Sequence, residues 1–120
     1  MKLLKKSTYE EKRSKFVTYL FEVTSKEELK EALNLVKEEN KKAKHLLRSA
    51  YYLNPYGVKT NEFSEDREPI SSMKKLSLEL ERKDLIGKAV FIVRYYGGVK
   101  FGSSYLDRVY FSLGLQILNS

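Results

Sequence analysis

Apolar residues recur along the chain in patterns that predict four β-strands. Residues 15–23 alternate between the two sides of a strand, and residues 45–53 carry apolar side chains on both sides. Residues 58–63 follow a Pro- and Gly-containing turn and are expected to return as the second half of a hairpin. Residues 89–93 form an unbroken apolar run rich in β-branched side chains, which is typical of a strand covered by other structure. Residues 2–6 are compatible with a short edge strand.

Three further segments have the 3.6-residue apolar period of amphipathic helices. The first starts at Ser25, which forms a capping box with Glu28, and closes near residue 40. The second is capped by one of the serines at positions 71 and 72 and runs to about residue 84. The third starts at Ser104, with Asp107 at capping-box spacing, and runs to about residue 118.

These elements follow one another in the order strand, helix, strand, strand, helix, strand, helix. The order and the hairpin predict an α+β sandwich, with a mostly antiparallel sheet and helices packed on one face. A chain of 120 residues is expected to be one domain, residues 1–120, large enough for a core of its own.

The composition excludes several kinds of site. The chain has no cysteine, so disulfides, thiolate metal ligands and a cysteine nucleophile are ruled out. A single histidine argues against a histidine-based zinc site. No apolar run is long enough to span a membrane, and the N-terminus lacks the apolar core of a signal peptide. We therefore expect a cytoplasmic protein without membrane contact, metal or cofactor.

The formal net charge of +7 permits nucleic acid or another acidic surface as a partner. Basic residues concentrate within residues 2–15 and 41–48. A solvated charged face is the alternative, because surfaces rich in lysine and glutamate also occur for reasons of stability.

A glycine-rich loop separates the last predicted strand from the last helix. Gly97, Gly98 and Gly102 would let the backbone approach an anion in front of the free N–H groups of the helix. In that interpretation, positive charge comes from Arg94, Lys100 and Arg108. The alternative is a tight strand-to-helix turn, and residue chemistry alone favours it, because the spacing matches no nucleotide-binding fingerprint.

Other polar residues also have both a functional and a structural interpretation. Asp66 and Glu68 lie in an acidic loop that could hold a cation or transfer a proton, although a solvated loop is the commoner case. His45 is a lone histidine, and such residues are more often structural than catalytic. Tyr95 and Tyr96 are adjacent on one strand, so at least one faces outward, where it could stack on a base.

Residues 91–102, FIVRYYGGVKFG, resemble the signature of the Impact N-terminal domain family: an apolar strand, an arginine, aromatic residues, Gly-Gly and a further glycine. Residues 12–16, 44–45 and 65–69 are similar to the family's basic start, its basic-His pair and its acidic-Asp-Gly-Glu-Pro loop. The resemblance spans roughly residues 10–118.

The chain departs from the family pattern in both glycine-rich loops. Arg67 replaces the loop glycine, and residues 70–73 replace a Gly-Thr-Ala-Gly run. Ser103 and Ser104 stand where relatives usually have two more glycines. A binding site that depends on close backbone approach at these loops is therefore less open here.

The resemblance implies a two-layer β/α sandwich like the second domain of a small-subunit ribosomal protein and domain IV of elongation factor G, with a four-stranded sheet. It also implies a link to translation, because eukaryotic relatives associate with ribosomes and control initiation under stress. We expect a small non-catalytic module that contacts RNA or a ribosome-associated protein. The residues expected to bind are Arg94, Tyr95, Tyr96, Gly97, Gly98, Lys100, Gly102, Ser103, Arg108, His45, Asp66 and Glu68.

Two alternatives stay open at this point. One is an enzyme acting on a phosphorylated or anionic small molecule held at the helix N-terminus after Gly102, with Asp66 or Glu68 as acid or base. The other is a protein-binding domain with an exposed tyrosine patch. A deep pocket joining residues 64–72 to residues 97–104 would favour the enzyme. Burial of Arg94 in a structural ion pair would remove it from the binding surface.

Overall fold

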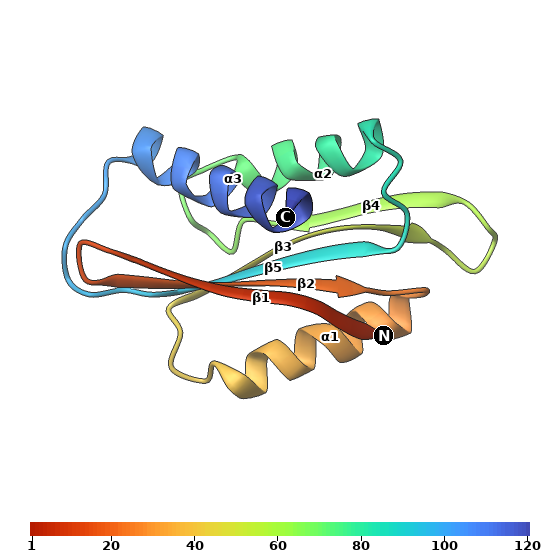
Figure 1. Cartoon of the computed structure of the whole chain (residues 1–120), viewed down its shortest axis with the longest axis horizontal. Coiled ribbons are helices and arrows are strands. Elements are labelled where there is room, and N and C mark those ends of the chain that lie inside the picture. Colours follow the sequence, from red (N-terminus) through yellow and green to blue (C-terminus); the bar gives the residue numbers. More distant parts are fainter.

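The computed structural model describes all 120 residues and contains five strands and three helices (Figure 1). The chain runs through β1 (Lys2–Glu11), β2 (Ser14–Glu22), α1 (Lys26–Glu39), β3 (His45–Leu53), β4 (Lys59–Ser64), α2 (Ser72–Arg82), β5 (Lys88–Tyr95) and α3 (Ser103–Asn119). The strands form one antiparallel sheet in the order β1-β2-β5-β3-β4, so β5 lies at its centre.

Helices cover both faces of this sheet: α1 lies on one face, and α2 and α3 lie on the other (Figure 1). The core beneath α1 includes Val17, Phe21, Val36 and Phe91. The core beneath α2 and α3 includes Phe16, Leu47, Leu76 and Tyr110. The prediction of helices on one face is therefore wrong. Successive residues of β2 and β5 are apolar and buried, so both faces of these strands need a cover.

The fifth strand is β1, which the sequence suggests only as a short edge strand. It spans ten residues and pairs with β2 from Lys2↔Glu22 to Glu11↔Ser14. Most of its side chains are exposed, so its apolar pattern is too weak to predict its length. The connecting turn consists of Lys12 and Arg13, whose φ angles are 48° and 66°. Two-residue hairpin turns of this kind need the left-handed region at both positions.

The helix caps agree with the sequence only at α1. There, the amide of Glu28 donates to Ser25 Oγ at 3.1 Å, as predicted. At α2, the N-cap Ser71 makes no side-chain cap, and Glu65 accepts from the amides of Met73 and Lys74 instead. The loop acid Glu65 is thus a helix cap.

The predicted capping box of α3 is also absent. Its N-cap is Gly102, which has no side chain to offer. Asp107 accepts from the amide of Ser71 at 2.8 Å and pairs with Lys75 at 2.6 Å. It thus ties the start of α3 to α2. None of the three helices combines the length and apolar character needed to cross a membrane.

Candidate functional site

Several segments from distant parts of the sequence meet at one end of the sheet. We call this end the rim and define it by residues 12–16, 44–45, 66–69 and 94–102. In Figure 1 it lies at the left, where the β1–β2 turn and the β5–α3 loop come together. The strand register places Arg94 opposite both Phe16 on β2 and His45 on β3. These three residues therefore lie side by side on three neighbouring strands at the rim.

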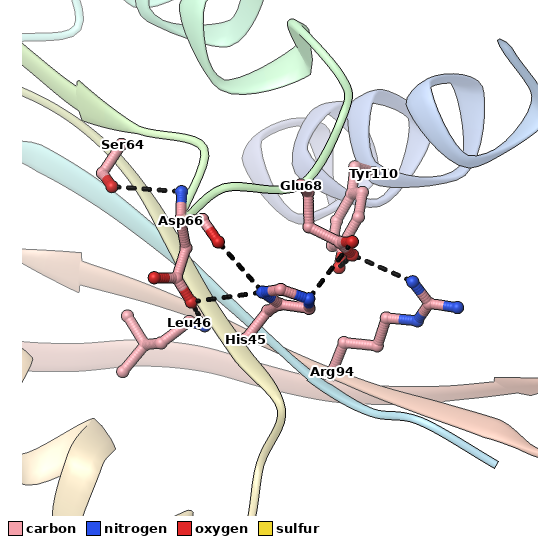
Figure 2. A network of polar contacts seen from close by, with 7 residues as sticks. All are labelled: His45, Leu46, Ser64, Asp66, Glu68, Arg94 and Tyr110. Atoms are coloured by element: carbon pink, nitrogen blue, oxygen red, sulfur yellow. Dashed lines mark hydrogen bonds and ion pairs between the residues drawn. The ribbon is translucent and has the colours of Figure 1, made fainter. Parts of the chain in front are cut away.

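A buried ion pair occupies the base of the rim (Figure 2). Arg94 Nη1 donates to Glu68 Oε2 at 3.0 Å, and the two residues are only 5% and 8% exposed. The hydroxyl of Tyr110 donates to the same carboxylate oxygen. Burial, together with the Glu68 carboxylate, raises the pKa of Tyr110 far above its ordinary value, so the phenol keeps its proton. Glu68 thereby joins its loop to β5 and α3.

His45 connects this pair to the 64–68 loop. Its Nε2 lies 3.3 Å from Glu68 Oε1, and its Nδ1 lies 2.9 Å from the carbonyl oxygen of Asp66. Asp66 Oδ2 accepts from the amide of Leu46 at 2.6 Å, and the amide of Asp66 donates to Ser64 Oγ. Nδ1 also lies 3.5 Å from Asp66 Oδ2. Both ring nitrogens thus face protein groups, which makes His45 a structural residue of the rim.

The position of Arg94 corrects the sequence interpretation. The prediction of a solvent-facing arginine is wrong, because its guanidinium is buried in the ion pair with Glu68. The guanidinium also lies 5.3 Å from the ring centroid of Tyr96 and 5.0 Å from that of Phe101. Arg94 therefore positions two aromatic side chains of the β5–α3 loop, residues 96–102, which we call the rim loop.

The two tyrosines that follow Arg94 separate to opposite sides, as their adjacency predicts. Tyr95 is half-buried on the α1 side, where its hydroxyl donates to Asn40 Oδ1 at 2.6 Å. Tyr96 is 45% exposed. It borders a hollow of about 260 Å³, together with Lys44, Lys100 and Phe101. His45, Glu68 and Arg94 line the same hollow, which joins the 64–71 loop to the β5–α3 loop.

Two glycines of the rim are required by the backbone conformation and packing of the rim loop. A Cβ on Gly97 would lie 2.0 Å from the carbonyl oxygen of Arg13, so only glycine lets the rim loop pack against the β1–β2 turn. Gly98 has a φ of +90°, which side chains rarely adopt. These positions fit the tight-turn interpretation that the sequence favours.

The start of α3 is a poor place for an anion. The hollow beside it is lined by Ser103 and Ser104 but also by the carboxylates of Glu68 and Asp107. Two acids next to the helix N-terminus oppose the field that would attract a phosphate. No group of three or more His, Asp or Glu side chains is arranged to hold a metal ion.

Some residues of the rim lie in segments that the sequence analysis singles out but are not among the residues expected to bind. Lys12 and Arg13 form the turn beneath the rim loop, and Phe101 stacks under Arg94. Arg108, which the sequence does select, lies farther along α3, 5.7 Å from the ring centroid of Tyr105. The position of this basic pair directly before the alternating strand at residues 15–23 is the feature that could have identified it.

The profile of the Impact N-terminal domain matches residues 12–118. This chain belongs to the Impact N-terminal domain family. A protein of Haemophilus influenzae described as an IMPACT family member is 31% identical over 100 residues, which cover 82% of this chain and 48% of that relative. The chain thus spans about half the length of the curated relative that it matches.

Two solved structures share the fold of this Impact domain. One, described as a hypothetical protein, matches with a TM-score of 0.82 and 25% identity over 96% of this chain and 56% of the other. The second is the two-domain translational regulator Yih1, with a TM-score of 0.54 and 19% identity over 89% of this chain and 44% of Yih1.

The structure shows which contacts the residues of the family pattern make in this Impact domain. Its arginine is the buried Arg94, and its first paired glycine, Gly97, is the contact with the β1–β2 turn. Arg67, which replaces the loop glycine of the pattern, has a φ of 65°. Glycine is the residue that adopts this angle without strain.

Proposed function

We propose that this Impact domain is a non-catalytic binding module of the cytoplasm that contacts RNA at the rim and acts in translation or its regulation. The observation that carries the proposal is an exposed ring, Tyr96, beside Lys44 and Lys100 at the edge of a hollow. Cations that hold phosphates beside a ring that stacks on a base are the elements of single-strand and loop recognition. Family membership and the fold shared with a translational regulator support the connection to translation.

The distribution of ion pairs supports a partner with negative charge. Neither Lys44 nor Lys100 has a carboxylate within ion-pair distance. The same holds for the other exposed basic residues around the rim, which are Lys12, Arg13, Lys15, Arg67 and Arg108. Unpaired cations at one end of the molecule would gain binding energy by releasing counterions from a nucleic acid.

The acid and base candidates of the enzyme alternative are already engaged within the protein. Glu68 binds Arg94 and Tyr110, and Asp66 binds the amide of Leu46. Both ring nitrogens of His45 face these two residues. A general acid or base needs a lone pair or proton directed at the substrate. We therefore favour binding over catalysis.

The test is RNA binding by fluorescence anisotropy across a salt series. We expect affinity to fall steeply with salt, and the Lys44→Ala/Lys100→Ala variant to bind more weakly with a shallower salt slope, by about 0.7 for each phosphate that the variant no longer neutralises. The matched control is Lys26→Ala/Lys30→Ala. These two exposed lysines of α1 lie at its N-terminal end, away from the rim in Figure 1, and likewise have no carboxylate partner.

Equal weakening by both double variants would show that the protein attracts RNA only through its net charge, and would overturn the rim as the site. Absence of RNA binding at low salt would overturn RNA as the partner. Association with ribosomes that persists after nuclease treatment would then point to a ribosome-associated protein.

A further inference from the structure

Aromatic side chains continue from the rim hollow along the surface of α3 to β1. We call Tyr96, Phe101, Tyr105 and Tyr9 the aromatic row. The rings of Phe101 and Tyr105 lie 6.0 Å apart between centroids. Tyr9, Tyr96 and Tyr105 are 41%, 45% and 37% exposed. The row therefore presents several ring surfaces to one ligand.

Cations alternate with these rings. Arg94 lies over Tyr96 and Phe101, and Lys12 lies 5.3 Å from the centroids of both Phe101 and Tyr105. Arg108 follows, 5.7 Å from the centroid of Tyr105. Lys12 and Arg108 are exposed and have no carboxylate partner. Their long side chains can swing from a ring to a phosphate while their charge stays beside the row.

Glu11 fixes the far end of the row. One of its oxygens accepts from the hydroxyl of Tyr9, and the other accepts from the hydroxyl of Tyr105, each at 2.6 Å. A single carboxylate thus holds two rings from different elements at a set spacing, with both of its oxygens directed at the phenols. Between these tyrosines and Arg108 lies a second hollow of about 270 Å³. The hydrogen bonds to Glu11 hold the two tyrosine rings beside this hollow in place, which lowers the entropic cost of binding.

We propose that the aromatic row binds single-stranded RNA, with bases stacked on Tyr96, Tyr105 and Tyr9 and with Lys12 and Arg108 on the intervening phosphates. This inference rests on the proposed function and adds the class of RNA and a second base-binding hollow between α3 and β1. The row favours a single strand, because the bases of a duplex are stacked on each other and are not free to stack on protein rings. Every base has a flat face, so sequence preference is expected to be weak.

The experiment compares a short single-stranded RNA with an RNA duplex of equal length. The single strand carries 2-aminopurine, whose fluorescence falls when it stacks. The chain has no tryptophan, so this probe can be excited without exciting the protein. We expect quenching on binding, and weaker binding of the duplex at equal salt. Tyr105→Leu and Tyr9→Leu keep an apolar side chain but lose the ring, and each is expected to weaken single-strand binding at least about fivefold.

The matched control is Tyr56→Leu. Tyr56 is 89% exposed in the β3–β4 turn, at the opposite end of the sheet from the rim. This variant should bind like the unchanged protein. Thermal denaturation of all three variants checks that they fold, which is expected because the altered side chains are exposed.

Two results would overturn the inference and differ from each other. If RNA binds but the duplex binds equally well and neither Tyr105→Leu nor Tyr9→Leu weakens binding, the rim contacts phosphates alone and the proposed function survives. If the unchanged protein binds neither RNA, the proposed function and the aromatic row fail together.

Discussion

At the scale of single residues, the guanidinium of Arg94 lies between the Glu68 carboxylate and the rings of the rim. This charge is buried, and its partner Glu68 lies 26 positions earlier in the chain. Removing either member of a buried pair leaves the other uncompensated. Arg94 thus acts on the rim through stability and through the placement of Tyr96 and Phe101.

We expect Arg94→Ala to lower the free energy of unfolding by roughly 3–5 kcal/mol, because Glu68 would then be buried without its cation. Urea denaturation measures the change. Lys100→Ala, at an exposed rim position, should stay within about 0.5 kcal/mol of the unchanged protein. A near-neutral effect of Arg94→Ala would mean that water reaches Glu68 and that the pair is not structural.

The sequence identifies the residues of this site better than it identifies their roles. Arg94, His45, Asp66 and Glu68 are all selected from the sequence, and the structure brings all four together. Their burial is not predictable from local patterns, because it depends on Tyr110 and on the return of the 64–68 loop over β3. A polar residue at the end of an apolar strand looks the same in sequence whether it faces water or a buried partner.

At the scale of elements, the β1–β2 turn affects stability and is expected to affect the proposed RNA binding. Lys12 and Arg13 hold left-handed φ angles that cost side-chain-bearing residues about 1 kcal/mol or more each. Asn-Gly is the pair that such a turn favours. Here two basic residues occupy it directly beneath the rim loop, whose Gly97 approaches the carbonyl oxygen of Arg13.

We expect Lys12→Asn/Arg13→Gly to raise the free energy of unfolding by about 1 kcal/mol and to weaken RNA binding. Urea denaturation and anisotropy measure the two effects. Lys12→Gln/Arg13→Gln is the control, because it removes the same charges but keeps the strained backbone: binding should fall equally while stability stays unchanged. A stabilised variant with full affinity would remove the turn from the binding surface.

Local apolar patterns predict most of the strands and helices of this fold. The predicted strands at 15–23, 45–53, 58–63 and 89–93 correspond to β2 to β5, and the three predicted helices are present. The errors lie where a tertiary contact decides, as at α3, where Asp107 bonds to Ser71 and Lys75 instead of capping its own helix. The use of both sheet faces follows from the doubly apolar strands, but only once the strand order is known.

At the scale of the whole molecule, ionised carboxylates contribute to stability. Hydrogen bonds from Lys6 and then Tyr19 lower the pKa of Glu39 below its ordinary value of 4.5. A hydrogen bond from Lys59 lowers the pKa of Asp84 in the same direction. Burial raises the pKa of Glu65, so the ionised form of this group contributes to stability in the opposite direction. A carboxyl group with a lowered folded-state pKa contributes stability above its unfolded-state pKa, and this is lost as the pH falls through the folded-state value.

We therefore expect the Tm to change little between about pH 7 and pH 5 and to fall below about pH 4. Thermal denaturation at a series of pH values measures this. Glu39→Gln should lower the Tm at neutral pH and reduce the fall in acid, because its proton uptake is removed. A Tm that stays constant down to about pH 3 would show that these carboxylates are equally ionised in the folded and unfolded chains.

The central place of β5 has a consequence for how the protein is synthesised. The two hairpins β1–β2 and β3–β4 leave the ribosome first, but neither pairs with the other. The edges of β2 and β3 stay unpaired until residues 88–95 have been synthesised and β5 pairs with both strands. Open strand edges are sites of misassembly, and long-range pairing of this kind is slow. The interval before residue 95 emerges is thus when the nascent chain is most exposed to aggregation.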